Sequence, residues 1–230
     1  MLAQLRPARR VTLTDGVYES VQALVMEHVV APGERINIDA LARRLEVSPT
    51  PVREALARLE ADGLVRKRPL AGYTAAPLLT RTEFDELVEM RLILETAAAS
   101  RVADRVADGP GEATDLAGLR QAADLPGPAA QSHGYAAIAE FTARDARFHQ
   151  LLAEQSGNRM LHDAVVRLRA HLHLFRLHFP TAHYGVSGRE HQLIVDAIGR
   201  GDAVAATAAM RAHLLAARDR HLPFFTEPGR

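Results

Sequence analysis

Residues 37–65 read NIDALARRLEVSPTPVREALARLEADGLV, and this stretch decides the fold of the N-terminal part of the chain. It holds two short helical patterns joined by a sharp connection. Asn37 can cap the first helix, because its side chain accepts a hydrogen bond from a free N–H group of the first turn. Ser48 can cap the second, and Pro49 at the first helical position loses no hydrogen bond. Gly63 then ends the second helix.

The second helix has one apolar face and one partly basic face. The apolar residues recur at helical spacing and are Val52, Ala55, Leu56 and Leu59. The residues left facing outward are Thr50, Arg53, Ala57 and Arg58. Two helices joined by a tight turn, with the second one exposed and basic, are typical of a helix-turn-helix that places its second helix in the major groove of DNA.

A short hairpin pattern follows the second helix. Residues 64–68, LVRKR, are apolar and then basic, residues 69–72 have turn chemistry, and residues 73–75 can form a return strand. This pattern predicts a small β-wing with a basic first strand. Two interpretations remain open at this point: a winged helix, or a helical hairpin inside a larger core with residues 66–68 as a solvated run of charge.

The stretch resembles the winged helix of GntR-family bacterial transcription regulators. APGERI, LARRLEVS, TPVREALARLEADGLV and the wing-tip Gly72 stand in that family's order and spacing, and the resemblance runs from about residue 13 to residue 77. Many members have an arginine after the cap serine that touches a base, whereas this chain has Pro49, which cannot hydrogen-bond a base edge. The resemblance implies a dimer on double-stranded, palindromic operator DNA. The expected DNA-contacting residues are Ser48, Thr50, Arg53, Arg43, Arg66, Lys67 and Arg68.

Composition narrows the class of protein. The chain has 230 residues, 47% of them apolar and 24% charged, which is ordinary for a globular protein of one or two domains. It has no cysteine, which excludes disulfides, thiolate catalysis and cysteine-zinc sites. No apolar run approaches the roughly 18 residues of a membrane span, and the N-terminus lacks the apolar core of a signal peptide. We therefore expect a cytoplasmic protein that does not interact with membranes.

Net charge is zero overall, with 11 basic and 9 acidic residues up to residue 77 and a small acidic excess after it. Such a weak asymmetry means that DNA binding would depend on where individual charges lie. Histidine is distributed far less evenly: of 11 histidines, only His28 precedes residue 133.

The fold class predicted is mainly α, with an N-terminal winged helix-turn-helix that carries a small β-wing and a C-terminal all-α bundle. The predicted helices of the two halves cover residues 14–30, 39–45, 49–62, 80–106, 112–123, 135–155, 160–179, 189–198 and 202–221. The predicted organisation is a disordered basic tail at 1–12, the DNA-binding domain at 13–77, a linker at 78–81, an all-helical effector and dimerisation domain at 82–222, and a tail at 223–230. Thr80 and Glu83 form a capping-box pattern at the start of the long helix.

Four residues of the second half form a candidate metal site. Asp145 and His149 are four apart and project from one helix face. His191 and His213 lie among apolar neighbours in the last two predicted helices. Helical bundles hold metals by converging such side chains, and a carboxylate with neutral imidazoles suits zinc, nickel, manganese or iron better than calcium or magnesium. The alternative from spacing alone is four unrelated side chains.

Residues 80–222 resemble the FadR-type effector domain of the same family, through EMRLILE, DARFHQLLAEQSGNRML, EHQLIVDAIGRGD and AAMRAHL. Members with this pattern bind a metal through one aspartate and three histidines, and these positions fall on Asp145, His149, His191 and His213. The resemblance implies a divalent metal, with zinc as the first expectation and nickel, manganese or iron as the others. The loop 109–132 does not align.

Arg91 is the candidate effector-binding residue. It lies mid-helix among apolar residues, where a buried arginine needs an anion, either a small carboxylate effector or Glu95 one helical turn on. His171 and His173 are two apart, so only one can share that face. The expected function is a metabolite-responsive transcription regulator, a repressor and not an enzyme. The alternatives are a regulator that senses the metal itself and a metal-dependent enzyme, although no nucleophile or general base is evident near the cluster.

Overall fold

The computed structural model describes residues 12–69, 72–109, 114–125, 135–177 and 184–225. The chain divides into two compact units, the first ending at Pro77 and the second beginning at Leu78. The predicted disordered tail at 1–12 lies outside the described residues, except for Thr12. No helix among the described ranges is long and apolar enough to cross a membrane.

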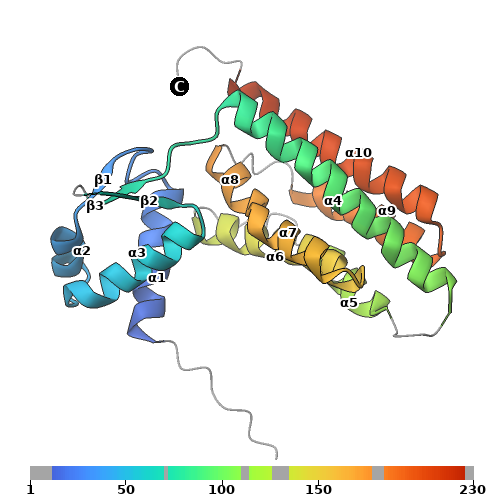
Figure 1. Ribbon diagram of the computed structural model, residues 1–230, viewed down its shortest axis with the longest axis horizontal. Helices are drawn as coiled ribbons and strands as arrows, with labels where there is room; N and C mark the ends of the chain where they lie inside the picture. The colour runs from blue at the N-terminus through green and yellow to red at the C-terminus, as the bar shows by residue number, and fades with distance from the viewer. Residues whose placement is uncertain (1–11, 70–71, 110–113, 126–134, 178–183, 226–230) are drawn as a thin grey trace, which may run out of the picture. The chain divides into compact units, whose positions relative to one another are not determined.

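The first unit is a three-helix domain with a small antiparallel sheet (Figure 1). Its elements are α1 (Leu13–Met26), β1 (Arg35–Ile36), α2 (Ile38–Arg44), α3 (Pro49–Ala61), β2 (Val65–Arg68) and β3 (Gly72–Ala75). The central strand β3 pairs with β2 on one side and with β1 on the other. The prediction of a winged helix-turn-helix is confirmed. The sequence did not predict β1, because two residues are too few to show an alternating pattern.

The helix ends of the first unit follow local capping chemistry. Thr12 and Asp15 form a capping box at the start of α1, and the side chain of Asn37 accepts a hydrogen bond from the N–H of Ala40 at the start of α2. The first helix is shorter than predicted, since it ends at Met26 and His28 takes a left-handed φ of 57°. Its buried residues pack against α3, and the fully buried core positions are Val25, Val52, Ala55, Leu56, Leu59, Leu64 and Ala75.

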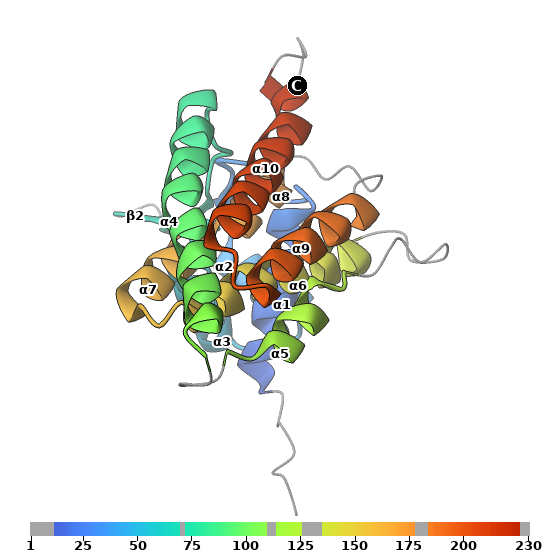
Figure 2. The same ribbon diagram turned by 90° about the vertical axis from the view of Figure 1, so that its right-hand side faces the viewer.

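The second unit is all-helical, as predicted. Its helices are α4 (Arg81–Ala107), α5 (Leu116–Ala123), α6 (Tyr135–Gln155), α7 (Arg159–Leu168), α8 (Ala170–Leu177), α9 (Tyr184–Gly199), α10 (Ala203–His221) and the 3-10 turn η2 (Leu222–Phe225). Helix α4 lies beside α10 along much of its length, and α9 packs on both (Figure 2). Phe148, Leu152, Ile194, Ile198 and Met210 are fully buried where α6, α9 and α10 meet.

The single helix predicted over residues 160–179 is wrong. The structure has two helices, α7 and α8, separated at Arg169, whose backbone is left-handed at φ 48° and ψ 29°. Nothing in the local sequence predicts this break, because arginine favours helix and no glycine or proline is near. Because of this break, α8 need not continue in the direction of α7, and this matters for the candidate site.

The ends of the second unit also differ from the predicted boundaries. The capping box of Thr80 and Glu83 is present and α4 begins at Arg81. In the segment predicted as a linker, Leu78 and Leu79 pack against a buried cluster formed by α4 and α8. At the other end, part of the predicted tail forms η2, and the ring of Phe225 lies 5.0 Å from that of Phe84. The helical bundle therefore extends beyond its predicted limits, into the predicted linker at one end and into the predicted tail at the other.

Candidate metal centre and nucleic-acid interface

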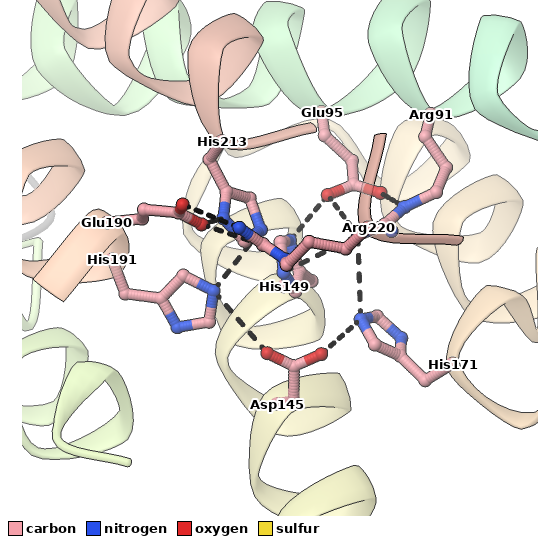
Figure 3. A network of polar contacts seen from close by, with 9 residues as sticks. All are labelled: Arg91, Glu95, Asp145, His149, His171, Glu190, His191, His213 and Arg220. Carbon is pink, nitrogen blue, oxygen red and sulfur yellow. Dashed lines mark hydrogen bonds and ion pairs between the residues drawn. The ribbon is translucent and has the colours of Figure 1, made fainter. Parts of the chain in front are cut away.

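Five helices of the second unit direct polar side chains toward one buried point (Figure 3). The four residues predicted from the sequence are brought together there: Asp145 and His149 from α6, His191 from α9 and His213 from α10. One ring nitrogen from each of the three histidines lies within 4.8 Å of those from the other two. Nε2 of His191 is 3.4 Å from Nε2 of His213 and 3.5 Å from Oδ1 of Asp145. Asp145 and His149 therefore project from the same face of α6, as their four-residue spacing indicates.

Glu95 of α4 orients His149 from the opposite side. Its Oε2 lies 2.5 Å from Nδ1 of His149, whose side chain is fully buried. The carboxylate is an acceptor, so it selects the tautomer that carries a proton on Nδ1. The lone pair of His149 is then on Nε2, the nitrogen that faces the cluster. Glu95 was considered from the sequence only as a partner for Arg91, and its position one turn after Arg91 was the available signal.

His213 is oriented in the same way by Glu190. Oε2 of Glu190 lies 2.7 Å from Nδ1 of His213, and both Glu190 oxygens accept hydrogen bonds from Arg220, at 2.8 and 2.9 Å. His213 therefore also presents an unprotonated Nε2 to the cluster. The sequence analysis missed Glu190 and Arg220, and the only local signal was that Glu190 directly precedes His191.

Arg91 and His171 complete the cluster on its other side. Arg91 is 4% exposed and donates from Nε to Oε1 of Glu95 at 2.6 Å. Its Nη2 lies 3.5 Å from Nε2 of both His149 and His171. Nε2 of His171 is also 3.3 Å from Oδ2 of Asp145. Asp145, His149 and His171 thus form a second group of three donors, which shares His149 with the group of His149, His191 and His213. His171 is the residue of the His171 and His173 pair that reaches this face.

The electrostatics of the cluster favour charged carboxylates and neutral imidazoles. Burial opposes ionisation of Glu95, but Arg91 and His149 outweigh it and hold the pKa of Glu95 well below its ordinary value. Partial burial also opposes ionisation of Glu190, while hydrogen bonds from His213 and Arg220 lower its pKa to about 2. Burial lowers the pKa values of His171, His191 and His213, and neighbouring positive charge adds to this effect.

These residues fit a divalent metal of the borderline class. Metal-binding histidines normally donate the other ring N–H to a carboxylate. Nδ1 of His213 has this hydrogen bond with Glu190, and Nδ1 of His149 lies in contact with the Glu95 carboxylate. Oδ1 of Asp145 is buried and has no hydrogen-bond partner among the described residues. One carboxylate oxygen and several neutral imidazole nitrogens at this spacing match the ligands that zinc, nickel, manganese or iron take in proteins.

Little free space adjoins Arg91. A cavity of about 10 Å³ is lined by Arg91, by Arg218 of α10 and by apolar residues of α4, α8 and α10. A volume of that size holds roughly one water molecule. A carboxylate effector at this position would therefore need the surrounding side chains, or α8, to move.

In the first unit the predicted DNA-contacting residues are all exposed. On α3, Thr50 and Arg53 face outward, while Val52, Ala55, Leu56 and Leu59 on the opposite face are fully buried. The remaining exposed candidates are Arg43 in the last turn of α2, Ser48 at the start of α3, and Arg66, Lys67 and Arg68 on β2. One helix face and the neighbouring wing strand thus offer several cations and hydroxyl groups to a partner.

Ser48 stands at the N-cap position of α3, as predicted, but its side chain makes no capping hydrogen bond. Pro51 removes one of the two N–H groups that a cap side chain can bond, that of the third helical position, and leaves the N–H of Thr50 at the second. The Ser48 hydroxyl and the N–H of Thr50 at the positive end of the helix are therefore disposed toward an anion.

Arg58 is exposed together with Arg53, as expected, and it also binds α1. Its Nη1 lies 2.8 Å from Oδ1 of Asp15, and its guanidinium stands 4.4 Å from the centre of the Tyr18 ring. The hydrogen bond from Arg58 and the bonds from Thr12 lower the pKa of Asp15 to about 2. Arg58 therefore joins α3 to α1, although about half of its side chain stays exposed.

Comparison with known families divides the chain at the same place as its structure. Residues 13–74 match the model for bacterial regulatory proteins of the gntR family. Residues 86–216, more than half of the chain, match the FCD domain. The candidate nucleic-acid interface lies in the first match and every member of the polar cluster except Arg220 lies in the second.

Individual relatives and a solved structure are similar to this chain over much of its length. An uncharacterized HTH-type transcriptional regulator in the TAR-I ttuE-ttuC' intergenic region of Agrobacterium vitis is 36% identical over 135 residues, 59% of this chain and 75% of that protein. The HTH-type transcriptional repressor NanR of Cronobacter sakazakii (strain ATCC BAA-894) is 28% identical over 231 residues, covering 91% and 85%. A putative transcriptional regulator GntR from Rhodococcus sp. RHA1 has the same fold, with a TM-score of 0.66 at 22% identity, covering 91% of this chain and 97% of that one.

Proposed function

The chain belongs to the GntR family of bacterial transcriptional regulators and carries an FCD domain, and from this premise we propose that it is a metabolite-responsive repressor. The family and its relatives are transcriptional regulators rather than enzymes, so the metal-dependent enzyme considered from the sequence is set aside. One observation carries the effector half of the proposal: four helices, α6, α8, α9 and α10, converge a carboxylate and four imidazoles on a buried point, and α4 places an arginine beside it.

On the DNA side, α3 enters the major groove. Arg53 contacts a guanine edge, because an arginine can bond O6 and N7 together. Thr50 contacts a base or a phosphate, and Ser48 a phosphate. Arg43 and the three wing cations, Arg66, Lys67 and Arg68, act mainly on phosphates. Pro49 contributes no base contact, so sequence readout depends more on Arg53 than in relatives that have an arginine after the cap serine.

A palindromic operator has two half-sites about one helical turn apart and therefore needs a two-fold dimer. We propose that the second unit supplies most of the dimer interface and that the protein operates in the cytoplasm, where its operator is. Analytical ultracentrifugation at micromolar concentration, with and without operator DNA, tests this. A monomer under both conditions would rule out the dimer.

On the effector side, Asp145, His149, His191 and His213 would hold one divalent metal, zinc in the first place and nickel, manganese or iron as alternatives. The metal would supply positive charge and open coordination positions to a small carboxylate, for which Arg91 would be the second anchor. Glu95 and Glu190 keep the ligand tautomers in place from outside the ligand set.

The connection to DNA runs through α4 and α8. Arg91 lies on α4, which begins directly after the segment that leaves the first unit, and Leu78 and Leu79 of that segment pack in the cluster that contains Leu174 of α8. Movement of either helix on effector binding would shift this segment. The spacing of the two recognition helices in a dimer would change with it.

A regulator that senses the metal itself is the second candidate. The small cavity beside Arg91 favours it, because about 10 Å³ holds no carboxylate in the present arrangement. In that case ordering of α6, α9 and α10 around the metal would be the whole signal.

One titration distinguishes these functions. Operator affinity is measured by fluorescence anisotropy with and without zinc, and with and without a panel of small carboxylates, while circular dichroism follows the fold. Metal-dependent carboxylate effects support the proposed effector platform, and an effect of metal alone supports the sensor. Unfolding on chelation, with no carboxylate response of the metal-loaded protein, would leave the metal with a structural role only.

A further inference from the structure

His149 has one lone pair on Nε2, the nitrogen that faces the cluster. Either the Arg91 guanidinium or a metal ion can use this lone pair. Since the Glu95 carboxylate favours the tautomer with the proton on Nδ1, Nε2 of His149 is an acceptor, and Nη2 of Arg91 lies 3.5 Å from it. An sp² nitrogen has a single lone pair, so it can accept from Arg91 or bind a metal, but not both. Nη2 of Arg91 carries two N–H groups. One can donate to Oε2 of Glu95 at 3.4 Å, and the other loses its acceptor whenever His149 becomes a ligand.

His171 stands in the same relation to Asp145. Its Nε2 lies 3.3 Å from Oδ2 of Asp145, slightly longer than the usual N–H···O bond, so a proton on this nitrogen faces the carboxylate. Oδ1 of the same carboxylate faces His191 on the other side. Ligation of Asp145 draws its negative charge toward the first group of donors and weakens it as an acceptor for His171. The Nε2–H of His171, which lies 3.5 Å from Nη2 of Arg91, is thereby left with a weaker acceptor.

We propose that Arg91 and His171 form an oxyanion-binding pair that becomes available only when His149 and Asp145 are engaged as metal ligands. The inference rests on the proposed metal site and identifies the residues that recognise the effector there. In the metal-free protein the two donors are satisfied by His149 and Asp145. In the metal-bound protein both are buried and in want of an acceptor, which is costly unless an anion supplies one.

The pair selects a particular class of ligand. Two N–H donors close together match two oxygens of one carboxylate, and the guanidinium of Arg91 stays fixed by its bond to Glu95. A carboxylate with a further oxygen could reach the metal and this pair together. His171 lies on the short helix α8, so the anion would also hold α8 toward α4 and α6.

Calorimetric titration of the full-length protein tests the pair, with zinc and then acetate and citrate as probes. Wild-type protein is expected to bind citrate at least about tenfold more tightly with zinc than without, acetate following the same order. Arg91→Lys keeps the charge and the pairing with Glu95 but loses the fork that also reaches His149. It is expected to bind zinc about three- to tenfold more tightly than wild type and citrate about tenfold more weakly.

Two substitutions of His171 separate donation from packing. His171→Gln keeps an N–H near the position of Nε2 and should retain citrate binding within about threefold, whereas His171→Leu should lose about tenfold or more. His173→Gln on the same helix is the matched control and should behave as wild type.

The outcomes distinguish this inference from the proposed function. Equal citrate affinity with and without zinc would overturn the inference alone, as would unchanged citrate binding in His171→Leu. Weaker zinc binding by Arg91→Lys would overturn the competition for His149. A wild-type protein that binds no zinc, nickel or cobalt would overturn the metal site and the inference with it.

Discussion

The two units of the chain place their polar side chains in opposite ways. In the described part of the first unit, the polar and charged candidates for function are exposed and the buried side chains are apolar or belong to Tyr73 and Pro51. In the second unit, arginine, glutamate, aspartate and four histidines are buried together at 9% exposure or less. A surface that meets DNA can be built on an independent core, whereas a buried site is itself part of the core.

This difference has a consequence for mutations. Changes on the exposed face of α3 or on the wing should alter binding and leave stability nearly unchanged, because surface substitutions without buried contacts have small effects. Changes in the buried cluster should alter stability and binding together, because removing one member of a buried charged pair leaves the other without a partner.

The largest effect is expected from Glu95→Ala. It removes the partner of a buried arginine, so it should destabilise the metal-free protein by about 3–5 kcal/mol in urea unfolding. The matched control is Glu140→Ala, which breaks an exposed pair with Arg144 of the same i,i+4 spacing and should cost about 0.3–0.5 kcal/mol. Equal losses in the two variants would show that burial of the cluster does not govern its energetics.

Metal binding should give the next largest effect, since it links α6, α9 and α10. At a metal concentration one hundred times the Kd, thermal and chemical unfolding should show a stabilisation of about 2.7 kcal/mol. His149→Ala, His191→Ala and His213→Ala should each lose the bound metal, as measured by elemental analysis. Full occupancy in any two of these variants would mean that the ligands have been misassigned.

The same site predicts a direction for pH dependence. The folded pKa values of His171, His191 and His213 are lowered, so the unfolded chain binds protons that the folded one does not. Stability of the metal-free protein is therefore fully present above the ordinary histidine pKa of about 6.5 and is lost as pH falls below it. Metal affinity should fall over the same range, because protonated imidazoles cannot be ligands.

The sequence predicted most of the architecture because its signals are local. Caps such as Thr80 with Glu83, the four-residue spacing of Asp145 and His149, and the apolar face of α3 depend on nearby residues only. The break at Arg169 depends on tertiary packing, and so does the strand β1, which exists only through its pairing with β3. These two features had no local pattern to reveal them.

The candidate site, like the fold, was predictable only where its signals are local in the sequence. Its four proposed ligands could be chosen from spacing and resemblance, but the residues that orient them could not. Glu190 reaches His213 across 23 positions, and His171 reaches Arg91 across 80. Such partners are adjacent only after the bundle has folded, and the unpredicted break before α8 helps to set the direction of His171.

On the first unit, Arg53→Ala should weaken operator binding by about 1–3 kcal/mol and relax specificity at one position in each half-site. Its free energy of unfolding should match wild type, because Arg53 is exposed. Anisotropy titrations with operator and scrambled DNA measure both effects. If the ratio of the two affinities stayed at its wild-type value, direct base readout by Arg53 would be excluded.

The smallest effect is expected from Lys67→Gln, and it concerns the salt dependence of binding more than its specificity. Lys67 lies exposed on β2, where its backbone N–H bonds Glu60 and its side chain is left to solvent or a phosphate. Each lost phosphate contact should make the slope of log affinity against log salt shallower by about 0.9, equally for operator and scrambled DNA. Arg144→Gln, an exposed cation of the second unit, is the control and should leave the slope unchanged. A slope for Lys67→Gln equal to wild type would remove Lys67 from the interface, and the charge of the wing would then have to act through Arg66 and Arg68 alone.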